Sequence, residues 1–183
     1  MDALELLLNR RSHPRLTAPA PAGEVLNNIL QAALRAPDHA SLTPWRFIIC
    51  QGSGLSKLGA LFEQSAIAND KSEKEIERAP QLPLRAPMVI IAITQYKAHE
   101  KVPREEQLAS TACAVMAMQM AAQAQGFNGI WRTGAFAHCD LVRNALELAQ
   151  EDEISGFLYL GTPMFETPEK APLNSEDYFS YWQ

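Results

Sequence analysis

Apolar residues recur at helical spacing in three stretches of the first half of the chain. The first stretch follows Asp2, whose carboxylate can cap a helix. The second covers residues 23–34, and the third follows a turn at residues 52–54. Each places its apolar side chains on one face, which is the pattern of a helix that covers a core. These faces consist of Leu4, Leu7 and Leu8; of Val25, Leu26, Ile29, Leu30, Ala33 and Leu34; and of Leu55, Leu58, Leu61 and Phe62.

The longest predicted helix runs from Pro103 to about Gly126, because proline is favoured in a first helical turn and glycine ends helices. At 1.5 Å per residue it spans roughly 35 Å. Its apolar residues lie on nearly every side, so we expect this helix to be buried all round. In a chain of this size the simplest partner is the same helix of a second copy, and the pattern therefore predicts a homodimer built on it.

Four further runs predict β-strands, at residues 45–50, 87–94, 127–133 and 154–160. The runs 87–94 and 154–160 are apolar almost throughout, as expected for strands buried on both faces. A short helix is predicted at about residues 140–148, with Asp140 as its cap. Because helices and strands alternate, this pattern allows a parallel α/β sheet as well as an antiparallel one.

Two segments fall outside the periodic pattern. Residues 68–85 are charged and contain prolines, and we expect them to form a mobile surface excursion. Residues 164–183 end in four aromatic residues, and exposing such a cluster at a free end would be costly. We therefore expect the C-terminal tail to pack on the partner subunit.

Composition and charge narrow the class of protein. The 183 residues are 47% hydrophobic, which indicates one globular domain spanning 1–183. The net charge of -5 and the lack of a basic run argue against nucleic acid or a membrane as partner. Three cysteines without a CxxC pair suggest neither a disulfide framework nor a zinc site, and the N-terminus does not read as a signal peptide. These features favour a cytoplasmic protein with reduced thiols.

The candidate chemistry centres on residues 34–49, which read LRAPDHASLTPWRFII. Two prolines interrupt the helix and leave polar side chains on a loop before the next strand. From spacing alone, Arg10, Arg11 and Arg35 are cations at helix C-termini, His39 is a surface histidine, and Trp131 is as consistent with core packing as with a ligand contact. No metal site is predicted, because the neighbours at 138–140 cannot easily all face one ion.

The chain resembles the flavin-dependent nitroreductases, and within them a subgroup of small NAD(P)H nitroreductases. The resemblance is specific by combination and covers nearly the whole chain. It is carried by Asn9-Arg10-Arg11-Ser12, Ala36-Pro37, Pro44-Trp45-Arg46-Phe47, residues 129–134 (GIWRTG) and residues 156–163 (GFLYLGTP).

This resemblance implies an FMN-binding α+β protein with a central, mostly antiparallel sheet flanked by helices, and a homodimer with FMN sites at the subunit interface. FMN would contact Arg10, Arg11, Ser12, Trp131, Arg132 and Thr133 of one subunit, together with Arg35 and His39 of the other. Relatives often carry a lysine near the flavin pyrimidine ring where this chain has Pro14. The resemblance also places NAD(P) near a helix C-terminus, although carbonyls there disfavour a pyrophosphate. That segment is Ala121, Ala122, Gln123, Ala124, Gln125 and Gly126.

The implied activity is an FMN-dependent NAD(P)H oxidoreductase with a ping-pong mechanism. Hydride passes from NADH or NADPH through flavin N5 to a nitroaromatic, a quinone or a similar acceptor. The chain lacks the usual nucleophile motifs, which is compatible with this activity because the flavin carries the chemistry, and no catalytic side chain is assigned. The alternatives are a flavin enzyme of the same fold with a specialised reaction, such as dehydrogenation or dehalogenation, and a non-catalytic dimeric flavin-binding protein.

Overall fold

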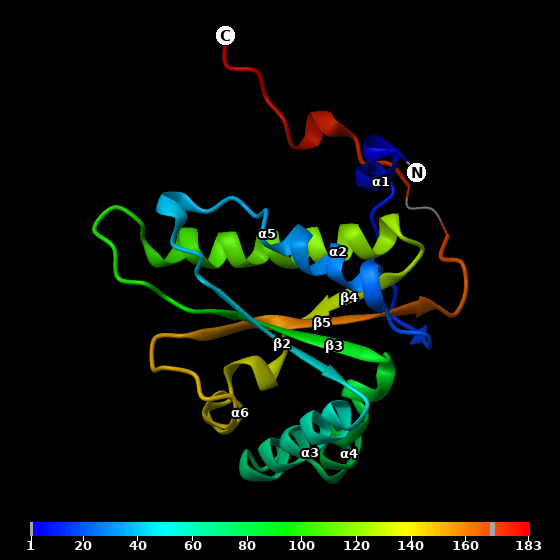
Figure 1. Cartoon of the computed structure of the whole chain (residues 1–183), viewed down its shortest axis with the longest axis vertical. Helices are drawn as coiled ribbons and strands as arrows, with labels where there is room; N and C mark the ends of the chain where they lie inside the picture. Colours follow the sequence, from blue (N-terminus) through cyan, green and yellow to red (C-terminus); the bar gives the residue numbers. More distant parts are fainter. Residues whose placement is uncertain (1, 169–170) are drawn as a thin grey trace.

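The two most apolar runs form the centre of an antiparallel sheet. The computed structural model describes residues 2–168 and 171–183, and it pairs β3 (Met88–Thr94) with β5 (Glu153–Pro163) (Figure 1). Every residue of β3 is buried, as expected for a strand covered on both faces. The sheet is therefore antiparallel, which the periodic pattern alone did not decide.

Three other strands complete the sheet around this pair. β2 (Trp45–Gln51) pairs with β3 on one edge, and β4 (Asn128–Arg132) pairs with β5 on the other. The short β1 (Leu16–Thr17) pairs with the end of β5. All of these pairings are antiparallel, which confirms the predicted α+β class and sheet.

One face of the sheet is covered by α2 (Gly23–Ala33) and α5 (Arg104–Ala124) (Figure 1). The core on this face consists of aliphatic and small side chains, and alanines let the helices approach the sheet closely. Its members, all at most 1% exposed, are Ile29, Ala33, Met88, Ile90, Ala92, Ala114, Val115, Met118, Ala122, Leu158 and Leu160.

The single chain does not bury α5 all round, and its burial by a second copy stays a prediction. Leu108 and Met116 are 37% and 46% exposed, and Cys113 is also exposed. These residues follow one another at intervals of three to five positions, so they form an open stripe along the helix. The helix therefore buries one face against the sheet and α2 and leaves another apolar face uncovered.

The opposite face of the sheet carries α3 (Ser53–Ala68), α4 (Glu73–Arg78) and α6 (Asp140–Ala145) (Figure 1). The segment 68–85, expected as a surface excursion, is instead helical and packs against α3. It starts at a capping box in which the Glu75 carboxylate accepts hydrogen bonds from the backbone and hydroxyl of Ser72. Two short 3-10 turns, η2 (Ala79–Gln81) and η3 (Pro83–Arg85), then lead into β3.

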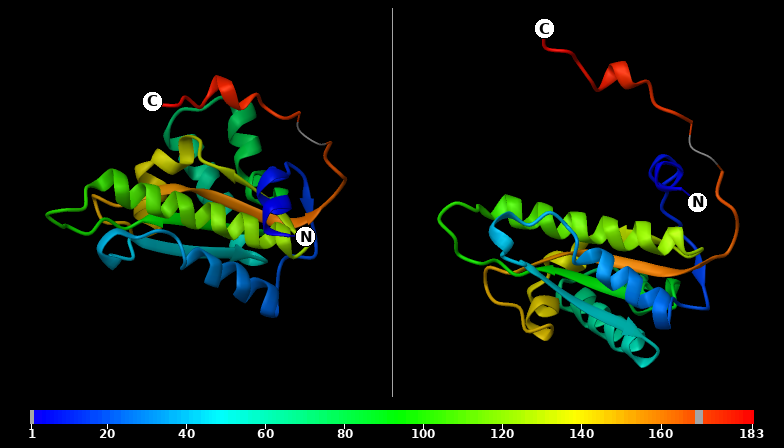
Figure 2. Two further views of the ribbon diagram at one scale, coloured as in Figure 1. Left: turned by 90° about the horizontal axis from the view of Figure 1, so that it is seen from above. Right: turned by 45° about the horizontal axis from the view of Figure 1, so that its top comes forward.

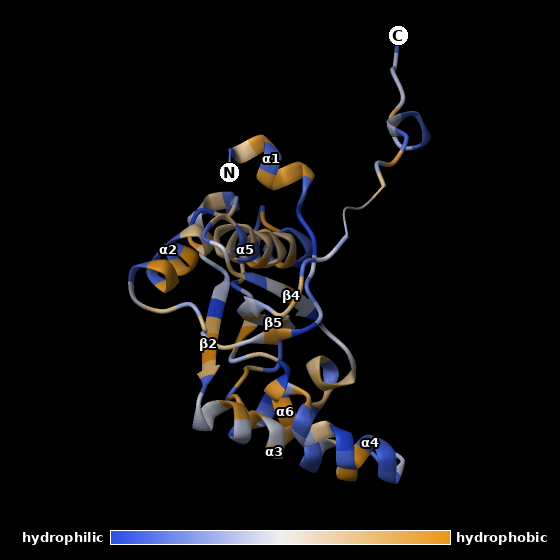
Figure 3. Cartoon of the chain, turned by 90° about the vertical axis from the view of Figure 1, so that its right-hand side faces the viewer, coloured by the Kyte–Doolittle hydropathy of each residue, from blue (hydrophilic) through white to orange (hydrophobic). Residues whose placement is uncertain are grey.

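The N-terminal helix lies near the C-terminal end of α5, where Gln123 Nε2 contacts the Asn9 carbonyl (Figure 1). Asp2 caps α1 (Ala3–Leu8) as predicted, because its carboxylate accepts from the backbone N–H of Leu4 and Glu5, each at 2.9 Å. Leu4, Leu7 and Leu8 of α1 remain exposed. Figure 3 shows this largely apolar helix standing apart from the sheet. The C-terminal tail contains the turn η5 (Ser175–Asp177) and extends away from the sheet (Figure 2). Within the described residues, no helix is both long enough and apolar enough to cross a bilayer.

Candidate functional site

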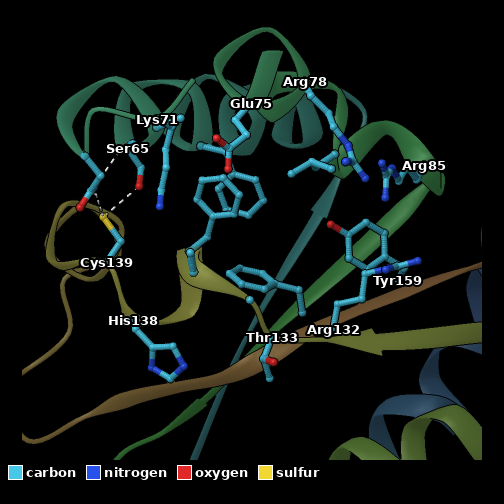
Figure 4. A pocket seen from close by; sticks show the side chains of 18 of the residues that line it. Ser65, Lys71, Glu75, Arg78, Arg85, Arg132, Thr133, His138, Cys139 and Tyr159 are labelled. Carbon is cyan, nitrogen blue, oxygen red and sulfur yellow. Dashed lines mark hydrogen bonds between the residues drawn. The ribbon is translucent and has the colours of Figure 1, made fainter. Parts of the chain in front are cut away.

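A cavity of about 660 Å³ opens on the face of the sheet that carries α3 and α4 (Figure 4). Its apolar wall is aromatic. Phe62 of α3 stacks on Phe136 with ring centroids 4.1 Å apart, and it meets the edge of Phe157 at 5.2 Å. This volume lies in the range of pockets that bind small molecules, and flat aromatic walls suit a planar ring system.

The end of β4 places three of the predicted site residues at this cavity, namely Trp131, Arg132 and Thr133. The indole of Trp131 is 37% exposed and donates a hydrogen bond from Nε1 to the Ser155 carbonyl at 3.1 Å. Arg132 lies opposite Phe157 in the strand register. Trp131 is therefore available for a ligand contact and is not enclosed in the core.

Gly156 allows the Trp131 indole to lie against β5. The register between β3 and β5 shifts beside Gly156, so that Ser155 is an extra residue in β5. Gly156 has φ +145°, and a Cβ atom there would lie 2.2 Å from Trp131 Nε1. A side chain at position 156 would therefore displace the indole from the cavity wall.

Three arginines gather on one side of the cavity, around the phenol ring of Tyr159 (Figure 4). They are Arg78 of α4, Arg85 of η3 and Arg132 of β4. Among residues 2–168 and 171–183, none of these guanidinium groups forms an ion pair with a carboxylate. The Nε atom of Arg132 is buried and has no hydrogen-bond partner in that part of the chain. The cluster therefore presents unsatisfied donors and positive charge to the cavity.

The pKa directions of the neighbouring groups agree with this charge distribution. Burial, and then the positive charges of Arg78 and Arg132, lower the pKa of Arg85. Burial raises the pKa of Tyr159, and the charges of Arg132 and Arg85 oppose that rise. Lys71 adds a fourth cation, whereas Glu75 is the one acidic residue of the lining, and its carboxylate is already bound to Ser72. The cavity is therefore electropositive.

Cys139 lies at the other side of the cavity (Figure 4). Asp140 was predicted to cap α6, but the N-cap residue is Cys139. Its sulfur accepts hydrogen bonds from Ser65 Oγ at 2.9 Å and Asn69 Nδ2 at 3.6 Å. Burial raises the pKa of Cys139, but these hydrogen bonds and those from the backbone N–H groups of α6 outweigh burial and lower it.

The predicted residues Arg10, Arg11 and Ser12 lie on a segment that runs beside β4. The backbone N–H of the following residue, His13, donates to the Gly129 carbonyl at 2.9 Å. Arg11 directs its guanidinium to the carbonyls of Thr167 and Pro168, at 2.7 and 3.1 Å, whereas Ser12 is exposed.

A second hollow joins this N-terminal segment to the arginine cluster, because Pro14, Arg15, Arg85 and Arg132 all line it. Of residues 10–12 and 131–133, Arg132 alone is among the residues that line this hollow. Residues 10–12 precede it along the chain, and the Gln119 side chain links the Arg11 carbonyl to the Gly129 carbonyl of β4. The structure also places Arg85 and Arg132 in the hollow that Pro14 lines.

Arg35 and His39 line neither hollow; they belong to the loop between α2 and β2, whose His39 end contacts the first turn of α5. His39 Nδ1 lies 2.7 Å from a carboxylate oxygen of Glu106 in the first turn of that helix. The N-terminal segment instead contacts Gln119, whose side chain donates to the Arg11 carbonyl at 3.3 Å. Thirteen residues separate Glu106 from Gln119, which is roughly 20 Å along the helix axis. One chain therefore does not bring the two predicted groups together.

The loop that carries His39 has an unusual backbone and is tied to α5. Trp45 Nε1 donates to Ser110 Oγ at 2.9 Å, and Ser110 Oγ donates to the Pro37 carbonyl at 2.6 Å. Ala40, Ser41 and Thr43 all have positive φ, at 61°, 53° and 47°. Three such residues in four positions are rare outside functional sites, because each costs conformational energy.

The segment predicted to contact NAD(P), residues 121–126, does not line the cavity. Ala122 is fully buried, and Gln123 Nε2 donates to the Asn9 carbonyl at 3.4 Å. Gln125 donates to the carbonyls of Ala121 and Val25 at 2.9 and 3.2 Å. These side chains hold the end of α5 to its neighbours, and the nucleotide contact at this segment stays a prediction.

A family model described as the Nitroreductase family matches residues 7–162. The chain belongs to this family. An Escherichia coli K12 protein named "Putative NAD(P)H nitroreductase YdjA" is 53% identical over 166 residues, which cover 91% of each chain. A Haemophilus influenzae protein named "Putative NAD(P)H nitroreductase" is 37% identical over 183 residues, covering 99% of this chain and 100% of the relative. The family assignment confirms the expectation of an oxidoreductase.

Solved structures of the Nitroreductase family have the same fold. A nitroreductase-like family protein from Bacillus cereus superimposes with a TM-score of 0.86 at 22% identity, covering 100% of this chain and 97% of the other. An FMN-dependent nitroreductase from Clostridium difficile gives 0.70 at 20% identity, with 98% and 99% covered. At such identities these structures support the fold alone.

Sequence reasoning about this Nitroreductase family member missed Arg78, Arg85 and Tyr159. Arg78 and Arg85 fall in the segment treated as a surface excursion, where charges indicate solvent exposure by default. The one local signal was Ser72 with Glu75, a capping box that predicts a helix start and hence an ordered segment. Tyr159 was included only in an apolar strand, and its neighbours across the cavity come from distant parts of the chain.

Proposed function

We propose that the chain is an FMN-dependent NAD(P)H oxidoreductase that reduces nitroaromatic compounds, quinones or similar acceptors. The observation that carries the proposal is the cavity at the end of β4, where an exposed indole, an aromatic wall and an unpartnered buried arginine nitrogen meet. The relatives named above as NAD(P)H nitroreductases support the nucleotide, and the Clostridium difficile structure supports FMN by its name. We further propose that residues 1–183 form a single FMN-binding domain.

The donor set at the cavity fits a flavin. Arg132 Nε is a buried donor that has no partner among the described residues, and a flavin ring offers carbonyl and nitrogen acceptors at its edge. Trp131 and Thr133 would hold the ring from the end of β4, and Arg10 and Ser12 would bind the phosphate from the segment beside that strand. When bound, FMN supplies the hydride transfer from NAD(P)H to the acceptor, in an order in which the oxidised nucleotide leaves before the acceptor enters.

The residues of the chain bind and orient the reactants. Phe136, held in place by stacking on the buried Phe62, gives a preformed apolar wall against which a nicotinamide or an acceptor ring can lie. The same wall excludes water from one side of the cavity. The cavity has a volume of about 660 Å³, which is large enough for a nicotinamide or an acceptor ring. The size of the cavity supports a mechanism in which NAD(P)H and the acceptor use this one site in turn.

We propose a homodimer in which the exposed stripe of α5 is the contact surface. Its residues Leu108, Cys113 and Met116 are apolar or weakly polar, and a second copy would remove them from water. The same pairing supplies the missing part of the site. Arg35 and His39 lie near one end of α5 and residues 10–12 near the other, so a two-fold related copy can bring the two groups together.

The C-terminal tail gives a second surface for that copy. Phe179, Tyr181 and Trp182 are 77%, 92% and 102% exposed in the single chain. The contacts of Arg11 with Thr167 and Pro168 direct the start of the tail past the N-terminal segment. We propose that the aromatic end packs on the partner subunit, because leaving three large rings in water is unfavourable.

The first test is an absorbance spectrum of the purified protein after incubation with FMN, followed by anaerobic addition of NADH and then NADPH. Flavin bands that bleach with a nucleotide and return with a nitroaromatic acceptor support the reductase. Protein that cannot take up FMN would contradict the whole proposal. Bands that persist under both nucleotides would favour a non-catalytic flavin-binding protein.

The variant Arg132→Gln is expected to weaken FMN binding, whereas Lys57→Gln on the exposed side of α3 is not.

The dimer has its own test. Met116→Glu places a charge in the proposed interface and is expected to yield monomers that have also lost FMN affinity. Ile67→Glu is the matched control, because Ile67 is a similarly exposed apolar residue on α3, at 55% against 46% for Met116. Sedimentation velocity measures the oligomeric state of both variants. A Met116→Glu protein that remains dimeric would show that the contact surface lies elsewhere.

A further inference from the structure

The arginine cluster lacks a counter-charge within the described part of the chain. Arg78, Arg85 and Arg132 line the same side of the cavity, and Figure 4 shows the first two directed toward one another above Tyr159. Like charges at short range repel, and this repulsion grows where water is partly excluded. No carboxylate among residues 2–168 and 171–183 pairs with any of them. An anion bound between the guanidinium groups would remove this repulsion.

The cluster adjoins the aromatic wall, and the two features together define a type of ligand. Tyr159 follows Phe157 by two residues on β5, so both side chains point to the cavity face. Phe62 and Phe136 continue the wall away from the arginines. A ligand that satisfies both surfaces has a planar ring on one side and a negative group on the other.

We propose that the cavity selects electron acceptors that carry a carboxylate or a comparable anionic group on an aromatic ring. This inference rests on the proposed reductase function. Arg78 and Arg85 bind the anionic group, because guanidinium forks match a carboxylate with two parallel hydrogen bonds. The ring lies against Phe136, whose ring is backed by the buried Phe62, at the wall that also includes Trp131 and Thr133. Neutral acceptors of the same size lack the arginine contact and bind more weakly.

The experiment compares 4-nitrobenzoate with 4-nitrobenzyl alcohol as acceptors for the FMN-loaded enzyme. The two probes share the nitro group and the ring and differ in charge. We expect kcat/KM to be at least about tenfold higher for the anion, the discrimination typical of a hydrogen-bonded charged group. That preference should shrink as salt is raised, whereas the rate with the neutral probe stays constant.

Variants of the arginine cluster test whether these side chains cause the preference for the anionic acceptor. Arg78→Gln and Arg85→Gln should each lower kcat/KM for 4-nitrobenzoate by about tenfold and change that for 4-nitrobenzyl alcohol by less than about twofold. Arg85→Lys should retain part of the preference, because it keeps the charge and loses the fork. Lys57→Gln removes a positive charge from the exposed side of α3 and should change neither value. Calorimetric binding of benzoate to the oxidised holoenzyme gives the same comparison without turnover.

The negative group could instead come from FMN or from the nucleotide, and the same variants distinguish these sources. If Arg78→Gln and Arg85→Gln lose FMN affinity, or raise KM for NADPH but not for NADH, the cluster serves the cofactor or the nucleotide phosphate and the inference is overturned. Equal reduction of both acceptors also overturns it, while leaving the reductase function intact. Benzoate binding without any nucleotide-driven bleaching would overturn the reductase function and still support the arginine contact.

Discussion

The two faces of the sheet are built from the same strands and yet differ in kind. On the α5 face every core residue is at most 1% exposed, and the side chains are aliphatic or small. On the α3 face the core is rich in aromatic rings and opens into an electropositive cavity. Neighbouring residues of β5 separate the two environments, since Leu158 points to one and Phe157 to the other. Alternate positions of one strand thus contribute to a closed core on one face and to the wall of a cavity on the other.

This difference predicts which mutations should affect stability and which should affect ligand binding. In a close-packed core the neighbours cannot move to fill the space of a truncated side chain. Truncations on the α5 face should therefore lower the free energy of unfolding strongly. The α3 face already contains an opening, and its residues should tolerate truncation better while affecting ligand binding more.

The largest expected effect is on the α5 face, called the closed face below, in contrast to the α3 face with its cavity, called the open face. Leu158→Ala should lower the free energy of unfolding by about 3 kcal/mol, because Leu158 is fully buried between α5 and the sheet. Leu82→Ala is the matched change on the open face, where Leu82 is half-buried at the cavity, and should cost about 1 kcal/mol. Urea unfolding at fixed protein concentration measures both. Equal losses would contradict the division between the faces.

The next effect lies where β4 meets the open face. Gly156→Ala should destabilise the protein by about 2 kcal/mol and displace Trp131, because the new Cβ would lie 2.2 Å from the indole nitrogen. Gly52→Ala separates the two causes, since Gly52 also has positive φ but has no atom within 4 Å of the added Cβ. Thermal unfolding and the emission of tryptophan report stability and the position of the indole. If both variants lose the same stability, the clash at Trp131 contributes nothing.

A mutation on the closed face should also weaken ligand binding, because α5 positions the N-terminal segment. Gln119 on α5 donates to the carbonyls of Gly129 and Arg11, at 2.9 and 3.3 Å, and so holds residues 10–12 beside β4. Gln119→Leu should cost about 1–2 kcal/mol of stability and weaken FMN binding. Gln64→Leu on the exposed side of α3 should do neither. Fluorescence titration with FMN measures the affinity, and an unchanged value would mean that the segment does not position the cofactor.

Much of the fold was predictable because its signals are local. Asp2 caps α1 as expected, and the buried run at β3 requires only a row of apolar residues. Strand direction was not predictable from periodicity, since alternation of helices and strands fits parallel and antiparallel sheets alike, and the antiparallel prediction came from the family resemblance. Composition does not tell which apolar face of α5 the same chain covers, and the expectation that a second copy covers the exposed stripe stays a prediction.

The candidate site was predictable only in part. Residues 131–133 were found through a motif, and the structure places them at the cavity. Arg78 and Arg85 carried no motif, and their meeting with Arg132 depends on the path of residues 68–85 across the sheet. The N-cap of α6 is Cys139 and not Asp140, one position from the prediction, and the contacts of its sulfur with Ser65 and Asn69 could not be predicted because these residues are distant in sequence.

The smallest expected effect concerns Cys139 and its pH dependence. Because the hydrogen bonds around its sulfur lower the pKa of Cys139, the reactive thiolate forms at lower pH than for an ordinary cysteine. The rate of alkylation by iodoacetamide should therefore rise with pH and reach its plateau at a lower pH than for an ordinary cysteine.

Ser65→Ala removes the donor at 2.9 Å and so raises the pKa of Cys139. The plateau should then move to higher pH, while the free energy of unfolding changes by less than about 1 kcal/mol. Peptide mapping by mass spectrometry separates Cys139 from the other two cysteines, and Ser56→Ala on the exposed side of α3 is the control. An unchanged pH profile in Ser65→Ala would mean that the hydroxyl does not stabilise the thiolate.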